Sequence, residues 1–132
     1  MKLFDFGLAT ELRPAFRVGP NKYKCSIAGT RRYMSPEAIM GKEYGLPADV
    51  YSFAILLNEM ISQKKPFAGA TAANHKRAVG VFRQRPAILK TCPRSLKRLI
   101  QSAWTHNPDN RPNIQVVHER LESYISKDKD CQ

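Results

Sequence analysis

Two hydroxyl-bearing residues, Ser26 and Thr30, lie among basic side chains in the first part of this 132-residue chain. The neighbouring cations are Lys22, Lys24, Arg31 and Arg32. A phosphate added to either hydroxyl could order this segment through charge-assisted hydrogen bonds to those cations. These residues therefore have the chemistry for phosphate-dependent ordering, but their types alone do not assign them a regulatory role.

One carboxylate near the start, Asp5, follows Lys2-Leu3-Phe4, where we expect a short strand, and precedes Phe6 and Gly7. Magnesium is a hard ion that prefers oxygen ligands, and proteins often hold it with one or two carboxylates plus substrate phosphates. Asp5 has the right chemistry, but one carboxylate cannot make such a site alone. An incidental turn after a short strand would give the same three residues.

The histidines and cysteines show no spacing typical of a metal centre, a catalytic triad or a disulfide framework. The three cysteines are odd in number and lack a CxxC pair, so reduced thiols are the simplest interpretation. We therefore expect the histidines to occupy ordinary surface or core positions and not to bind a metal or form a triad. These residues are His75, His106 and His118, with Cys25, Cys92 and Cys131.

The composition predicts one soluble domain with a substantial basic surplus. The chain is 42% hydrophobic and carries a formal net charge of +11. Basic residues occur in short scattered pairs without interleaved aromatic residues, which favours a solvated surface over nucleic-acid binding. No apolar run approaches the roughly 20 residues of a membrane span, and no signal-peptide block opens the chain. We expect an intracellular, cytoplasmic protein.

Helical periodicity dominates the second part of the chain. Apolar residues at helical spacing begin at Pro47, are interrupted near Lys65-Pro66, and continue more weakly over 70–81. Further stripes occur over 96–104 and 114–124, the last one opened by Asn113 as a cap. Residues 8–45 show no periodicity and predict a long loop. The expected fold is mainly α, a helical bundle preceded by this loop, with little or no sheet.

Four motifs occur in an order that resembles the C-terminal lobe of the protein kinase family. They are Asp5-Phe6-Gly7, the stretch from Gly29 to Glu37, Asp49-Val50-Tyr51-Ser52-Phe53, and Trp104 followed by Arg111-Pro112. The resemblance covers residues 2–121. Residues 29–34 are similar to serine/threonine kinases, and residues 49–60 to their tyrosine-kinase-like branch. The implied fold is a kinase C-lobe bundle preceded by an activation-segment loop.

The resemblance implies roles for the early motifs. Asp5, with Phe6 and Gly7, would hold Mg²⁺ against the phosphates of ATP, and Phe6 would pack into a hydrophobic core. Thr30 would make a supporting contact near the catalytic aspartate, which leaves Ser26 as the better phosphorylation site. The substrate pocket for the residue that follows the phosphoacceptor would be shaped by Tyr33 and Met34.

Other matching positions are structural in the family. Glu37 would form a buried ion pair with Arg111, and Asp49 would cap backbone amides of a catalytic loop. Trp104 would belong to the closing helices. Two departures occur in the long helix, where Ala54 replaces a usual Gly and Asn58 replaces a usual Trp, which removes a large apolar anchor.

The resemblance therefore predicts a partial serine/threonine kinase domain over residues 1–126, with a frayed tail at 127–132. ATP and Mg²⁺ would be cofactors of the intact parent, and partners would be a protein substrate or the missing N-lobe. No Gly-rich loop, Lys–Glu pair or catalytic-loop Asp precedes Asp5, so we expect this chain alone to be inactive and not to bind ATP–Mg²⁺ tightly. A truncated gene model would explain the abrupt start. The alternative is a catalytically dead C-lobe binding module.

Overall fold

The computed structural model describes residues 6–129, with the side chains of residues 6–126. Helices dominate, and the predicted mainly α fold with little sheet is confirmed. The α-helices are α1 (Pro36–Ile39), α2 (Pro47–Ser62), α3 (Ala72–Gly80), α4 (Arg94–Ala103) and α5 (Ile114–Lys129). The short elements are η1 (Pro14–Phe16), η2 (Arg31–Tyr33) and η3 (Pro108–Asn110), with strands β1 (Arg17–Gly19) and β2 (Lys22–Tyr23). The strand expected at residues 2–4 lies outside the described residues.

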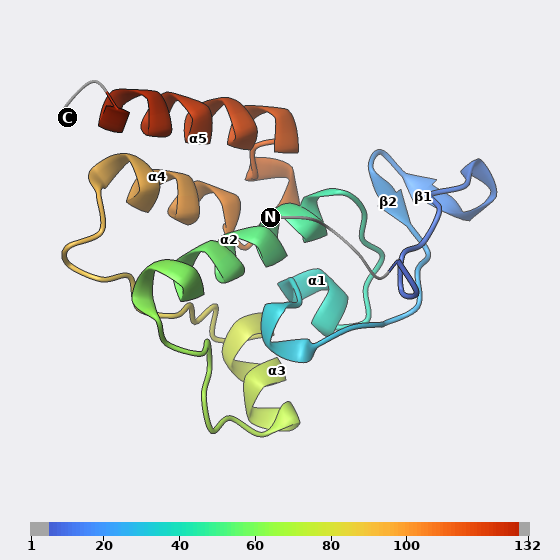
Figure 1. Cartoon of the computed structure of the whole chain (residues 1–132). Coiled ribbons are helices and arrows are strands. Elements are labelled where there is room, and N and C mark those ends of the chain that lie inside the picture. Colours follow the sequence, from blue (N-terminus) through green and yellow to red (C-terminus); the bar gives the residue numbers. More distant parts are fainter. Residues whose placement is uncertain (1–5, 130–132) are drawn as a thin grey trace.

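Helix α2 lies between α4 on one side and the pair α1 and α3 on the other (Figure 1). It begins at Pro47, whose missing N–H costs nothing in the first turn, and Asp49 lies near the positive end of the helix dipole. It ends because Gln63 adopts a left-handed conformation with φ 55°, and the Gln63 N–H donates to the Glu59 carbonyl at 2.8 Å. The end therefore comes before the predicted stop at Lys65-Pro66.

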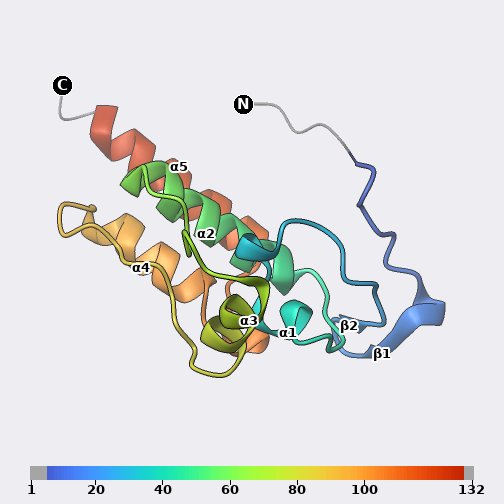
Figure 2. The ribbon, with the colours of Figure 1, turned by 90° about the horizontal axis from the view of Figure 1, so that it is seen from below.

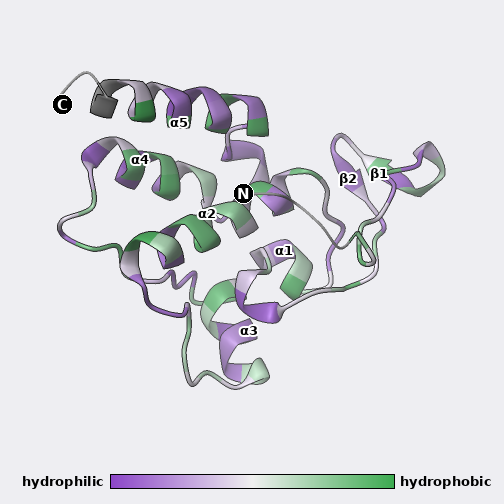
Figure 3. Cartoon of the chain, viewed as in Figure 1, coloured by the Kyte–Doolittle hydropathy of each residue, from purple (hydrophilic) through white to green (hydrophobic). Residues whose placement is uncertain are grey.

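The apolar residues of α2 at helical spacing match its buried face only in part; they are Val50, Phe53, Ala54, Leu57, Met60 and Ile61. Val50 and Ala54 are buried as this spacing predicts, but Met60 is 52% exposed, and Ile55, which lies off the stripe, is 0% exposed. Apolar residues predominate in this helix, whose visible side in Figure 3 is mostly green or pale, so periodicity could not select one face.

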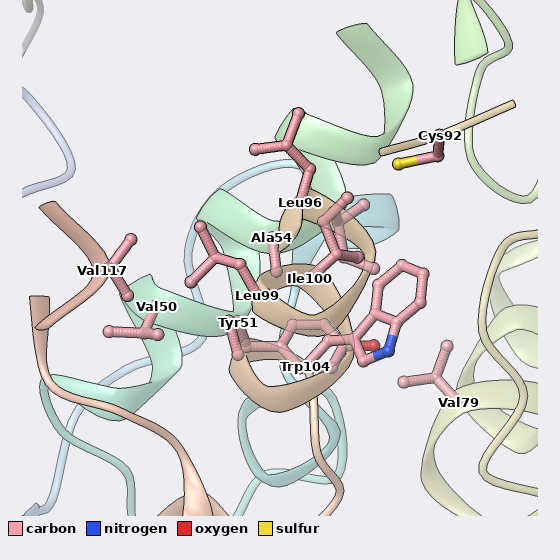
Figure 4. Close-up of a cluster of buried hydrophobic side chains, with 12 residues drawn as sticks. Val50, Tyr51, Ala54, Val79, Cys92, Leu96, Leu99, Ile100, Trp104 and Val117 are labelled. Carbon is pink, nitrogen blue, oxygen red and sulfur yellow. The ribbon is translucent and has the colours of Figure 1, made fainter. Parts of the chain in front are cut away.

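A hydrophobic core forms where α2 meets α4 and the start of α5. Figure 4 shows Tyr51, Ile100 and Trp104 together in this cluster. The predicted stripe of α4 is confirmed, since its apolar side chains are buried there. These side chains are Leu96, Leu99, Ile100 and Ala103.

Helix α5 packs against α4 and begins at the predicted cap. The Asn113 side-chain oxygen accepts a hydrogen bond from the Val116 N–H at 2.9 Å. Val117 is buried against the core, while Ile114 is 62% exposed. The helix continues through Lys129, past the start of the expected tail at 127, and residues 130–132 lie outside the described part.

Helices α1 and α3 pack against each other below α2 in the view of Figure 1. The contact is close at Gly80, where a Cβ atom would lie 2.6 Å from the Met40 sulfur. The predicted helix over 70–81 is confirmed as α3, and the Thr71 hydroxyl caps it by accepting from the Asn74 N–H at 3.2 Å.

The segment 8–45, expected as one long loop, contains more regular structure than the sequence indicated. Strands β1 and β2 form an antiparallel hairpin around Asn21, which has a φ of 52°. The segment also contains η1, η2 and α1. Strands of two and three residues are too short to produce a period-2 signal, so the pattern missed them. Figure 2 shows this hairpin at one end of the molecule, away from α4 and α5.

Candidate functional site

The segment expected to shape the substrate pocket is fixed to α2 by two hydrogen bonds. The Tyr33 hydroxyl donates to the Glu59 carboxylate at 2.7 Å, and the Ser52 hydroxyl donates to the Tyr33 carbonyl at 2.8 Å. The hydrogen bond to Glu59, assisted by burial, raises the pKa of Tyr33 above its ordinary value. Both the ring and the backbone of Tyr33 are therefore held in place.

Met34 follows Tyr33 and lines a cavity of about 350 Å³ between the N-terminal segment and the start of α2. Asp49 and Ser52 line the same cavity, together with Leu8 and Ile27. Desolvation raises the pKa of Asp49, and among the described residues no hydrogen-bond donor reaches its carboxylate. The structure thus brings Met34 and Asp49 to one cavity, with the Asp49 carboxylate unpaired within residues 6–126.

A bidentate ion pair joins Glu37 of α1 to Arg111, which follows η3. The Arg111 guanidinium nitrogens lie 2.7 and 2.8 Å from the two Glu37 carboxylate oxygens. The side chains are 0% exposed for Arg111 and 9% for Glu37. Burial alone would raise the pKa of Glu37, but the hydrogen bonds and charge of Arg111 outweigh it and lower that pKa. The structure therefore places these two residues in the contact that the sequence predicts.

Arg111 has no free donor. A guanidinium carries five N–H groups, and besides its two bonds to Glu37 it donates to three backbone carbonyls. These are Thr105 at 2.9 Å, Pro47 at 2.8 Å and His106 at 3.3 Å. The side chain therefore ties together α1, the first residue of α2 and the turn between α4 and η3.

Two guanidinium groups, those of Arg85 and Arg111, lie over the ring of Tyr51. The guanidinium carbons of Arg85 and Arg111 lie 5.0 and 5.1 Å from its ring centroid. Burial raises the pKa of Tyr51 to about 12, although both arginines oppose the shift. Arg85 also donates to the Trp104 carbonyl at 2.9 Å. Trp104 is buried in the core.

The segment around Ser26 is tied to the loop before α2. The Tyr44 hydroxyl donates to the Ser26 carbonyl at 2.7 Å, and Tyr23 and Tyr44 form an antiparallel bridge. Gly45 permits this approach, because a Cβ there would overlap the Asn21 carbonyl oxygen. The Ser26 side chain is exposed.

The remaining predicted residues near the start are exposed or lie outside the described part of the chain. Asp5 lies outside the described residues. Phe6 is 71% exposed, so its expected packing into a hydrophobic core is not met within this chain. Gly7 is also exposed, and Thr30 precedes η2 without a side-chain capping bond. No group of three potential metal ligands occurs among the described residues.

Four side chains have buried polar atoms without a hydrogen-bond partner among the described residues: Tyr51, Asn58, His75 and His106. Asn58 is 2% exposed, and its amide nitrogen donates to the Ala87 carbonyl at 3.2 Å while its oxygen has no partner. His75 is buried against Phe67 in an edge-on contact of 4.6 Å between ring centroids, and neither ring nitrogen is bonded. Asn58 therefore leaves an unbonded polar oxygen at the position where the resemblance implied a large apolar ring.

Sequence reasoning missed three residues that organise this region. Glu59 and Ser52 hold the Tyr33 segment, and their polarity within an otherwise apolar helix was a usable signal. Arg85 lies in the irregular segment before α4, where no pattern marks it.

Comparison with known proteins agrees with this architecture. A family model described as "Protein kinase domain" matches residues 1–121. Dual specificity protein kinase shkC of Dictyostelium discoideum is 36% identical over 126 residues, covering 95% of this chain and 24% of the relative. Mitogen-activated protein kinase kinase kinase 7 of Drosophila melanogaster is 34% identical over 133 residues, covering 98% of this chain and 18% of the relative. Serine/threonine/tyrosine-protein kinase HT1 of Arabidopsis thaliana is 38% identical over 127 residues, covering 94% of this chain and 30% of the relative.

The chain belongs to the protein kinase family, and the predicted resemblance is confirmed. It spans less than a third of the length of each of these three relatives. Their names include dual specificity and serine/threonine/tyrosine kinases, so family membership leaves the acceptor residue open. Within residues 6–129, no helix has both the length and the apolar character needed to cross a membrane.

Proposed function

We propose that this chain is part of a serine/threonine protein kinase domain, which in the full-length parent transfers a phosphoryl group from ATP to protein substrates. The observation that carries this proposal is the Tyr33 anchor on α2 beside the cavity that holds Met34 and Asp49. A rigid wall at this position would orient the substrate residue that follows the acceptor hydroxyl. We also propose a cytoplasmic location.

Asp5 would hold Mg²⁺ against the ATP phosphates, where the ion neutralises the charge that develops during transfer. The described residues do not form a magnesium site by themselves, because no three potential ligands gather among them. The roles of the other side chains are positional. Tyr33 and Met34 would orient the substrate, and Thr30 would support the acceptor geometry.

This chain by itself should not transfer phosphate to a Ser/Thr substrate. Phosphoryl transfer depends on positioning and on several groups that stabilise charge together, and one carboxylate cannot replace them. The test is incubation of the purified chain with ATP, Mg²⁺ and a generic Ser/Thr protein substrate. Turnover that Asp5→Ala abolishes would contradict the expected inactivity.

Ser26 is the proposed activating phosphorylation site. Its side chain is exposed, and its carbonyl accepts from Tyr44, so a phosphate there would act on a segment already tied to the body of the chain. Phosphate mapping on protein isolated from its own cells should find modification within residues 23–30. Its absence from this stretch and its neighbours would contradict the proposal.

The alternative function is a catalytically dead C-lobe module that binds partners through its surface. The net charge of +11 favours this alternative, because a large surplus of positive charge attracts acidic partners whether or not the chain is catalytically active. The reading frame upstream of Met1 distinguishes the two functions. A Gly-rich loop and a catalytic-loop Asp in frame would support the kinase.

A further inference from the structure

The net positive charge of this chain is concentrated in one stretch of sequence, because the acidic residues lie outside it. Between Glu59 and Asp109 there is no acidic residue, whereas ten residues are lysine or arginine. This stretch contains the end of α2, the whole of α3 and the whole of α4. A surface with so few counter-charges attracts anionic ligands over several ångströms.

Part of this surplus adjoins the Tyr33 segment. Arg32 of η2 donates a hydrogen bond from its guanidinium to the Pro66 carbonyl at 3.2 Å, which joins η2 to the loop after α2. Arg31 precedes Arg32, and Lys64 and Lys65 precede Pro66. We call Arg31, Arg32, Lys64 and Lys65 the basic rim.

The basic rim is not neutralised within the described chain. None of its four residues forms an ion pair among residues 6–126, in contrast to Arg111 and Arg13. The nearby carboxylate of Glu59 accepts the Tyr33 hydroxyl instead. Arg31, Lys64 and Lys65 are exposed, so their charges are available to a ligand.

We propose that the basic rim selects acidic substrates, with Asp, Glu or phosphoserine on the C-terminal side of the phosphoacceptor. This inference rests on the proposed function, in which Tyr33 and Met34 receive the residue that follows the acceptor. An arginine fork matches carboxylate and phosphate groups, and the flexible lysines add point charges. The rim adjoins the Tyr33 segment, and the neighbouring rings of Tyr33 and Phe67 pack against the hydrophobic core instead of forming a stacking platform, which favours a peptide over single-stranded nucleic acid.

The test is peptide binding to this chain by fluorescence anisotropy at near-physiological salt, without ATP. One peptide carries three Glu residues after a central Ser, and its partner carries three Gln residues there. We expect the Glu peptide to bind about tenfold more tightly, from the modest contribution of each exposed charge contact. Equal affinities would overturn the proposal.

Two triple variants separate the rim from net charge. The rim variant is Arg31→Gln, Lys64→Gln and Lys65→Gln, which leaves the structural Arg32 intact. The matched control, with the same loss of charge at exposed positions, is Lys90→Gln, Lys97→Gln and Arg98→Gln. The rim variant should lose most of the preference for Glu, and the control, whose positions lie in or just before α4, should keep it within about twofold, because attraction between exposed charges weakens with distance and is screened by salt. Equal losses in both would show attraction by net charge alone.

This design also separates the inference from the proposed function. Binding needs no phosphoryl transfer, so an inactive chain can still prefer the Glu peptide and support the basic rim. An active parent kinase that phosphorylates the Glu and Gln peptides equally would contradict the rim and leave the kinase function standing. If a single-stranded DNA oligonucleotide binds more tightly than the Glu peptide and the rim variant loses this binding, the ligand of the rim is nucleic acid and the peptide proposal is wrong.

Discussion

Replacing Glu37 by Gln tests the buried ion pair most sharply. The substitution keeps the shape of the side chain but removes the charge that faces a fully buried guanidinium. Breaking one partner of a buried pair costs about 3–5 kcal/mol, since the other charge remains desolvated. The five hydrogen bonds of Arg111 hold it in place, so it cannot turn toward water to recover solvation.

The chain contains a matched control in the ion pair between Glu11 and Arg13. That pair has the same 2.7 Å contact distance, but its side chains are 64% exposed for Arg13 and 74% for Glu11. Glu11→Gln should change the free energy of unfolding by no more than about 0.5 kcal/mol. Chemical denaturation of the three proteins measures both effects. Similar small losses for Glu37→Gln and Glu11→Gln would refute the buried-pair reasoning.

The same pair predicts a pH dependence. The pKa of Glu37 is lower in the folded chain than its ordinary value of 4.5, so the unfolded chain binds the proton more readily. The stabilisation is fully present above pH 4.5 and is lost as pH falls through the lower folded-state pKa. Glu37→Gln should lack this acid-dependent component, which denaturation at pH 6 and at pH 3 would measure. An unchanged pH profile would contradict the pairing.

Three further predictions concern other buried contacts. Burial, assisted by the Arg32 charge, lowers the pKa of His75 from 6.5, so the stability of the fold should decrease as pH drops below 6.5. His75→Leu should reduce this decrease, which thermal melts at pH 7.5 and 5.5 would measure. An identical pH dependence in the two proteins would contradict this. Asn58→Leu removes an unbonded buried oxygen and adds apolar contact, but it also removes the donor to the Ala87 carbonyl. Because Ala87 is exposed and its carbonyl can bond to water instead, the substitution should stabilise the fold by about 1 kcal/mol, and a clear loss of stability in denaturation would oppose this. Gly45→Ala should lower the free energy of unfolding by about 1–3 kcal/mol and speed hydrogen exchange at the Tyr23 and Tyr44 amides. The control Gly19→Ala, where an added Cβ would have its nearest contacts at 3.8 Å, should do neither. Equal effects of the two substitutions would count against the close approach at Gly45.

The long helices were predictable because their signals are local. The Asn113 cap and the α4 stripe depend on residues within a few positions of one another, and both occur as expected. The contact between Glu37 and Arg111 came from the family motifs, since no local pattern relates residues so far apart in sequence.

Other features depend on tertiary packing that the sequence pattern does not contain. The buried face of α2 could not be chosen, because apolar residues such as Ile55 and Met60 occur on several sides. The three carbonyl acceptors of Arg111 come from backbone groups, which have no residue-type signature. His75 is buried by its neighbours in space, and a lone histidine gives no indication of this.

Phosphate incorporation by the protein made from its complete cellular reading frame tests the central claim most directly. The substrates would be matched peptides with Ser, Thr or Tyr as the acceptor, supplied with ATP and Mg²⁺. We predict transfer to Ser and Thr that is lost in the Asp5→Asn variant, while the 132-residue chain alone transfers none. Absence of transfer by the complete protein, or transfer that Asp5→Asn leaves unchanged, would contradict the proposed kinase function.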